Sequence, residues 1–206
     1  QSALLEAMAE HQITVGGTTR KLPDLFMVLA TQNPLEQSGT YRLPEAQLDR
    51  FLFQINLDYP TLEEEIEISR RARKAYEGHV DDGLTAALKP DQILALREQL
   101  NDIFIEEHIE RYAIEIVVAT RKLGDYLPDW ADLVQAGASP RASIALLRAS
   151  MARAFLDGRD HVLPEDVVAL APDVLRHRLI LDFAAQAEGI SADDIIAALL
   201  NTITMP

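Results

Sequence analysis

Cysteine is absent from this 206-residue chain, and tryptophan occurs only once. The absence of cysteine excludes disulfides, thiolate metal sites and a cysteine nucleophile, and it fits a cytoplasmic protein. Basic residues are also scarce, because 19 lysines and arginines stand against 33 acidic residues and leave a formal net charge of −14. An acidic surface repels phosphate groups, so this balance disfavours broad binding to nucleic acid or to an anionic membrane.

Long apolar runs are also missing, and none approaches the roughly 20 residues that a bilayer span needs. We therefore expect no membrane-spanning segment. The first residues, Gln1 to Leu5, lack methionine and the basic stretch of a secretory signal, and they lie inside an expected helix. We expect the chain to be a piece of a longer protein. Its 48% of hydrophobic and 25% of charged residues are typical of a globular protein with a real core.

The first 60 residues mix helix and strand signals. We expect a helix over residues 2–10 and then a hairpin around Gly16-Gly17, because both central residues of such a turn need a positive φ. The apolar run 25–31 predicts a strand buried on both faces, which the following proline ends. Residues 51–57 predict a second strand.

Residues 61–206 carry almost wholly helical patterns, so the chain is predicted to be mainly α. The helix starts are marked by capping residues or by proline in the first turn. These marks are Thr61 with Glu64, Pro90, Ser139-Pro140, Pro164, and Ser191 with Asp194. We expect residues 124–138 to form a loop that Trp130 holds against the body.

Two candidate functional residues lie next to the expected strands, one after the first strand and one before the second. Asn33 lies just beyond the apolar run, where ligands bind in open α/β sheets, and its amide could hold a water or a phosphate oxygen. The alternative is that Asn33 only caps the strand or begins a turn. Arg50 precedes the second expected strand, and a guanidinium there could reach across a subunit interface to a transferring phosphoryl group. The alternative is a surface pair between Asp49 and Arg50.

Arg141 is the third candidate. It lies in the first turn of an expected helix, where the helix dipole disfavours a cation, so it needs an anion nearby. A carboxylate elsewhere in the chain or a nucleotide phosphate would serve equally well. By contrast, we expect His177 to be a packing or surface residue.

Taken together, these segments resemble the MoxR family of AAA+ ATPases. The resemblance covers nearly the whole chain, and its motifs come in the family's order. The matching segments are 2–8, 30–34, 39–51, 137–142, 158–167 and 174–179. It implies a remnant of an α/β P-loop AAA+ core over residues 1–60, with the hairpin and the sensor 1 strand, and an all-α lid over residues 61–206.

The resemblance also implies a role for each candidate residue. Asn33 would be sensor 1, which orients the attacking water, and Arg50 would be the arginine finger that acts on the neighbouring subunit's nucleotide. Arg141 would be sensor 2, which reports the terminal phosphate to the lid. The hairpin over residues 12–22 would face the ring pore or a client.

The chain departs from the family pattern in what it lacks. It has no Gly-X-X-X-X-Gly-Lys-[Ser/Thr] loop and no Walker B acids, which are expected upstream of Gln1. ATP and Mg²⁺ are therefore expected in the full-length parent, whereas this chain alone is expected to bind neither and to be inactive. Without neighbouring strands, the apolar residues 27–30 should form an exposed edge and favour dimerisation.

The implied function is the coupling of ATP binding and hydrolysis to chaperone-like remodelling or maturation of protein complexes. The expected assembly is a homo-oligomeric ring, with a hexamer as the leading candidate, that acts on a protein client. A partner with a von Willebrand A-type domain often accompanies this family. The alternative is a stand-alone helical protein-interaction module without nucleotide chemistry. A DNA-acting AAA+ relative is disfavoured by the charge of −14.

Overall fold

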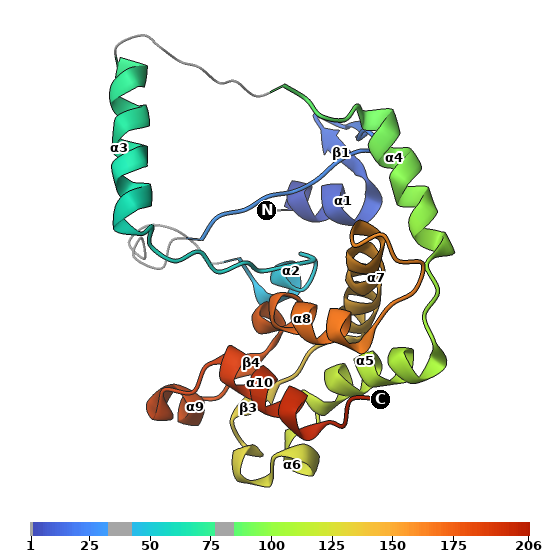
Figure 1. The fold of residues 1–206 in the computed structure, drawn as a ribbon, viewed down its shortest axis with the longest axis vertical. Helices are drawn as coiled ribbons and strands as arrows, with labels where there is room; N and C mark the ends of the chain where they lie inside the picture. The colour runs from blue at the N-terminus through green and yellow to red at the C-terminus, as the bar shows by residue number, and fades with distance from the viewer. Residues whose placement is uncertain (1, 33–42, 77–84) are drawn as a thin grey trace.

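The computed structural model describes residues 2–32, 43–76 and 85–206, and the structural statements below concern these ranges. Its elements are mainly helices with two small two-stranded sheets, which confirms the mainly α fold class. Helix α1 (Ser2–Glu10) and a hairpin lie beside α4 (Pro90–Gln99), and a bundle of helices forms the other part of the molecule (Figure 1). No helix of the described residues is long and apolar enough to cross a membrane.

The hairpin forms as predicted. Strands β1 (Gln12–Val15) and β2 (Thr18–Lys21) pair antiparallel. The two turn glycines, Gly16 and Gly17, have φ values of +57° and +78°, which explains why glycine suits both positions. The hairpin is tied back to α1 because the Glu6 carboxylate accepts from the backbone N–H of Thr14 at 3.1 Å and from its hydroxyl at 2.6 Å.

The strands predicted over residues 25–31 and 51–57 do not form. Within the described ranges, neither segment belongs to a strand or takes part in a β-ladder. A strand is stable only when a neighbour satisfies its backbone groups, and no described segment provides that neighbour. Met27 and Leu29 of the first segment are 74% and 83% exposed, but they form no strand edge, and the expected dimerisation stays a prediction.

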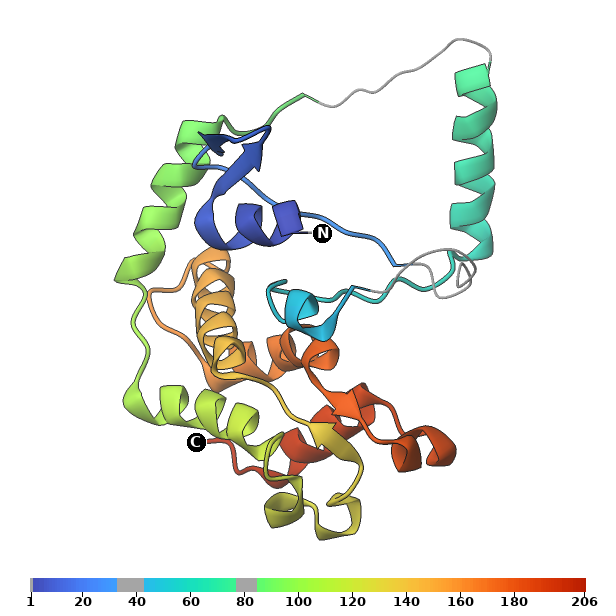
Figure 2. The same cartoon turned by 180° about the vertical axis from the view of Figure 1, so that it is seen from behind.

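Helix α3 (Leu62–Tyr76) begins where the sequence predicts, with a capping box between Thr61 and Glu64. It buries no residue, and Figures 1 and 2 both show it standing apart from the other helices. Its short neighbour α2 (Glu45–Leu48) instead lies against the bundle. The structure therefore holds α2 by tertiary packing, whereas local interactions stabilise α3.

The core lies in the bundle. Its main helices are α5 (Glu107–Ala119), α7 (Pro140–Leu156), α8 (Pro164–Leu175) and α10 (Ala192–Thr202). The smaller elements are η1 (Leu100–Asp102), α6 (Leu123–Tyr126), η2 (Pro128–Trp130), η3 (Arg176–Arg178) and α9 (Phe183–Glu188). Fully buried side chains such as Ile116, Leu146 and Ile195 come from different helices. Each contributes about 1.5–3 kcal/mol through burial, so the bundle is the stable part of the molecule.

The expected loop over residues 124–138 is more ordered than the sequence suggested. It contains the end of α6, the single turn η2 and strand β3 (Val134–Ala136), which pairs antiparallel with β4 (Ile180–Leu181). This sheet could not be predicted from the sequence, because its two strands are very short and far apart in the chain. Trp130 packs partly buried against the core, as expected.

Candidate functional site

A polar cluster joins the end of α2 to the start of α7 and to η3, and Asp49 is its centre. The Asp49 carboxylate accepts from Arg178 Nε at 3.1 Å through Oδ1 and from Arg141 Nη1 at 3.3 Å through Oδ2. The Ser139 hydroxyl lies 3.0 Å from both carboxylate oxygens. One carboxylate thus brings together three donors from distant parts of the chain.

The loop before α7 places two of these donors. Ser139 is the N-cap of α7, and its hydroxyl oxygen accepts from the backbone N–H of Arg141 at 3.2 Å. Gly137 precedes it in a position where a Cβ would lie 2.4 Å from the Thr120 carbonyl oxygen. Thr120 in turn accepts from the backbone N–H of Ala138 at 3.0 Å. Close packing against the end of α5 therefore sets the position of the helix start.

Arg178 is the buried member of the cluster, with a side chain only 2% exposed. Besides the Asp49 carboxylate, its guanidinium donates to the backbone carbonyls of Asp49 at 3.1 Å, Phe51 at 2.6 Å and Leu52 at 3.3 Å, and to that of Val174. Burial lowers the pKa of this guanidinium, and Asp49 opposes that shift. A buried cation is tolerated when it is paired and hydrogen-bonded, and Arg178 meets both conditions.

The two residues before Arg178 bind the same stretch of chain. The His177 ring Nε2 lies 3.1 Å from the Phe51 carbonyl oxygen, and Arg176 donates to the Gln54 carbonyl oxygen and to Asp193 at 2.9 Å. We call residues 49–54 the docked segment. Its backbone is held by three consecutive side chains of η3, which explains why the strand predicted at 51–57 is replaced by side-chain contacts.

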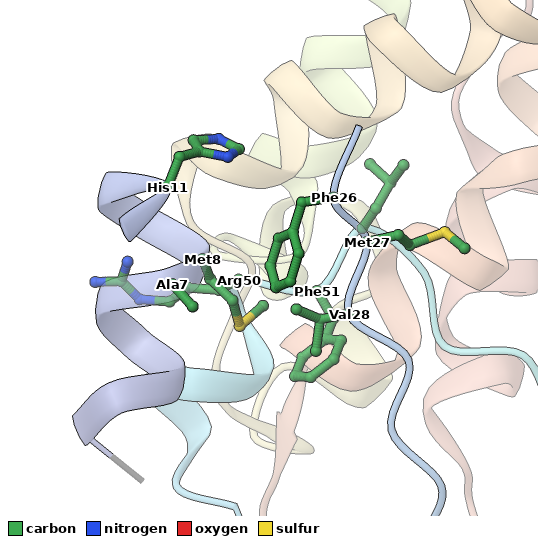
Figure 3. Close-up of a pocket in the computed structure, with 9 residues that line it drawn as sticks. Ala7, Met8, His11, Phe26, Met27, Val28, Arg50 and Phe51 are labelled. Carbon is green, nitrogen blue, oxygen red and sulfur yellow. The ribbon is translucent and has the colours of Figure 1, made fainter. Parts of the chain in front are cut away.

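Arg50 lies in the docked segment, directly after Asp49. It is partly buried, and its Nε has no hydrogen-bond partner among the described residues. With Phe51 and Leu52 it lines a cavity of about 220 Å³ against α1 and residues 26–28. Figure 3 shows the Arg50 side chain alongside α1 near Ala7 and Met8, with its guanidinium on the side away from Phe26. The ion pairs of residues 2–32, 43–76 and 85–206 include none that involves Arg50.

Comparison with known protein families identifies two parts of the chain. The family of ATPases associated with various cellular activities (AAA) matches residues 1–53, and the AAA lid domain matches residues 131–199. Chaperone MoxR1 of Mycobacterium tuberculosis is 44% identical over 209 residues, which cover 100% of this chain and 54% of that protein. The chain belongs to the MoxR family of AAA+ ATPases.

Two further proteins are similar to the whole chain. YeaC of Bacillus subtilis, an uncharacterized protein, is 41% identical and is matched over 100% of this chain and 61% of its own length. The crystal structure of a candidate ATPase from Cytophaga hutchinsonii superposes with a TM-score of 0.91 at 45% identity, covering 100% of this chain and 62% of that one. The chain therefore spans 54–62% of the length of these MoxR-family and structural relatives.

The site corresponds only in part to the sequence prediction. Asn33 lies outside the described residues. The alternative of a surface pair between Asp49 and Arg50 is not among the ion pairs of the described residues, because Asp49 pairs with Arg141 and Arg178 instead. Arg141 pairs with the Asp49 carboxylate. This is the first of its two alternatives, a carboxylate elsewhere in the chain.

Two site residues were missed by the sequence analysis. Arg178 was passed over, although Arg176-His177-Arg178 is a basic triplet in an acidic chain and directly follows the buried residues Val174 and Leu175. A basic triplet directly after an apolar helix end indicates that some of its cations are buried and need hydrogen-bond acceptors. Asp49 was considered only as a partner for its neighbour, whereas the structure makes it the centre of the cluster. No group of three or more possible metal ligands occurs among the described side chains.

Proposed function

We propose that this chain is part of a MoxR-type ATPase that couples ATP binding and hydrolysis to the remodelling or maturation of protein complexes. The family supports the ATPase part, and the relative named Chaperone MoxR1 supports the chaperone-like part. The observation that carries the proposal is that Arg141 binds Asp49, the residue directly before Arg50. Arg50 and Arg141 are 91 positions apart, yet Asp49 precedes the first and binds the second.

In this proposal Arg141 acts as sensor 2 and binds the terminal phosphate of ATP. The Arg141 side chain fits that role because it is 55% exposed and, in the part of the chain that the structure describes, makes a single hydrogen bond of 3.3 Å to a carboxylate. Arg50 acts as the arginine finger, which stabilises charge on the phosphoryl group of the neighbouring subunit's ATP. Asn33 is proposed as sensor 1, where an amide orients the attacking water.

The remaining parts of the proposal come from the family. The protein would act as a homo-oligomeric ring, with a hexamer as the expected size. It would act on a protein client, and a protein that contains a von Willebrand A-type domain is the candidate client. Mg²⁺ is proposed to accompany ATP in the full-length parent. A cytoplasmic location stays a prediction.

The test is Arg50→Ala in the full-length protein. Because the finger acts mainly on the transition state, we expect kcat to fall by about 10³–10⁵-fold. ATP affinity, measured by isothermal titration calorimetry, should change little. Arg71→Ala is a suitable control, because this side chain is 78% exposed and pairs with Glu67 on the same helix, α3.

A wild-type rate for Arg50→Ala would remove Arg50 from the mechanism. A parental protein that assembles but neither binds nor hydrolyses ATP would contradict the whole proposal. That result would favour the alternative of a helical interaction module.

A further inference from the structure

The two cations on Asp49 are held very unequally. Arg178 is 2% exposed and donates to the carboxylate and to four backbone carbonyls, so it is fixed in place. Arg141 is 55% exposed, and among the described residues its side chain makes one hydrogen bond, of 3.3 Å, to the same carboxylate. The carboxylate thus has one permanent partner and one that can leave.

The strength of the two pairs follows from their surroundings. Breaking a buried ion pair leaves an uncompensated charge and is strongly unfavourable, whereas an exposed pair contributes little. A nucleotide phosphate carries more negative charge than a carboxylate and can bind a guanidinium through two parallel hydrogen bonds. Arg141 can therefore exchange Asp49 for a phosphate at small cost, while Arg178 remains bound to Asp49.

Asp49 cannot follow Arg141 if that side chain moves. The docked segment is tied to η3 through the carbonyls of Asp49, Phe51 and Leu52, all bound by Arg178. The backbone N–H of Gln54 also donates to the Asp173 carbonyl at 2.9 Å. A movement of Arg141 towards a ligand must therefore break its pair with Asp49.

We infer that Asp49 is a positioning residue that holds Arg141 while nucleotide is absent and gives it up to the terminal phosphate, keeping Arg178 and Ser139 in both states. This inference rests on the proposed role of Arg141. It makes Asp49 a competitor of the nucleotide for the same guanidinium. It also links the two arginines, because the residue that loses Arg141 is the one directly before Arg50.

The test is a double-mutant cycle on nucleotide binding in the full-length protein, with Asp49→Asn and Arg141→Ala made singly and together. Asparagine keeps an acceptor for Arg178 but removes the charge that competes for Arg141. For an exposed pair, release of Arg141 should tighten the Kd of a non-hydrolysable ATP analogue about two- to sixfold. In the Arg141→Ala background the same substitution should have no effect. A loss of structural support would not tighten binding.

Arg148→Ala is the matched control, because Arg148 is an exposed arginine on the same helix, α7. If Arg141→Ala weakens binding but Asp49→Asn does not tighten it, the inference about Asp49 is wrong and the proposed function survives. If Arg141→Ala leaves binding unchanged, the proposed role of Arg141 itself fails.

A structure of the wild-type protein with the ATP analogue tests the inference without any variant that could unfold. We expect Arg141 Nη1 to lie more than about 4 Å from Asp49 Oδ2, beyond ion-pair range, while Arg178 Nε keeps its hydrogen bond to Oδ1. A nucleotide-bound structure in which Arg141 still pairs with Asp49 would overturn the inference.

Discussion

At the scale of single residues, His177 shows how burial decides protonation. Burial and the nearby Arg178 lower its pKa to about 4, although the hydrogen bond to the Phe51 carbonyl opposes the shift. Because a carbonyl oxygen only accepts, the ring donates through Nε2. Nδ1 is buried and has no hydrogen-bond partner among the described residues. A proton on Nδ1 would place a second charge beside Arg178 without an acceptor.

This arrangement predicts a pH-dependent loss of stability. The ordinary pKa of 6.5 applies to the unfolded chain and a pKa of about 4 to the folded protein, so the unfolded state binds a proton first as the pH falls. Stability supplied by neutral His177 is complete above pH 6.5 and is lost between there and pH 4. Because the ring is partly exposed, we expect a loss on the order of 1–2 kcal/mol.

Urea unfolding of the wild-type protein and of His177→Gln at pH 7 and at pH 4.5 measures this effect. Glutamine can still donate to the Phe51 carbonyl but cannot become charged, so its stability should fall less over this range. Gln135→Ala is the control, because Gln135 is an exposed, uncharged residue and its replacement should leave the wild-type pH dependence unchanged. Equal losses in wild type and His177→Gln would show that His177 does not titrate as inferred.

The site was predictable only for residues whose signal is local. Arg141 was found because a cation at a helix start contradicts the helix dipole, and the cap at Ser139 is visible in the sequence. The role of Asp49 was not visible, because its partners lie 90 to 129 positions away. Arg178 was missed because burial, and with it the need for acceptors, is a property of the assembled bundle.

At the scale of elements, the loop between β3 and α7 determines where the Asp49 cluster forms. Gly137 packs its Cα against the backbone of Thr120 at the end of α5, where any side chain would collide with it. The hydrogen bond of 3.0 Å from the Ala138 N–H to the Thr120 hydroxyl fixes the same contact. The start of α7, with Ser139 and Arg141, is therefore positioned by α5.

We accordingly expect Gly137→Ala to destabilise the protein by about 1–3 kcal/mol, because the new methyl group would overlap backbone atoms that cannot move aside easily. Thermal unfolding measures the loss. Gln135→Ala, an exposed position two residues earlier in β3, is the control and should stay within about 0.5 kcal/mol of the wild type. A fully stable Gly137→Ala would mean that the loop can be displaced freely.

The predicted strands show the opposite case, in which local pattern and structure disagree. Residues 25–31 have the apolar composition of a buried strand, yet Met27 and Leu29 are exposed and no ladder forms among the described residues. A helix such as α3 satisfies its own backbone, so its bounds follow from the sequence. A strand depends on neighbouring strands for its hydrogen bonds, so its formation does not follow from the local sequence.

At the scale of the whole molecule, the docked segment connects the AAA match to the lid match. The first match ends at residue 53, inside the docked segment, and the η3 side chains that hold this segment lie within the second match. The parts of the chain that match the AAA family and the AAA lid domain are therefore in direct contact. The hydrogen bonds of Arg178 and His177 to Phe51 carry that contact.

We expect the 206-residue chain by itself not to hydrolyse ATP. The sequence contains no phosphate-binding loop with its lysine, and the loss of such a cradle should cost more than the loss of an arginine finger, which is about 10³–10⁵-fold. A coupled phosphate-release assay on the purified chain, run beside the full-length protein, measures this. Turnover by the chain at the parental rate would contradict the prediction.

The sequence by itself determined the positions of most helices, the hairpin, the capping residues and the family. These features depend on residues that are close together in the chain or on motifs with a fixed order. Only the tertiary structure decided that Asp49 gathers Ser139, Arg141 and Arg178, and that the residues 51–54 bind η3 instead of a strand. The physical reason is that a buried charge and a backbone carbonyl both need a hydrogen-bond partner, and only the folded bundle determines which groups lie within reach.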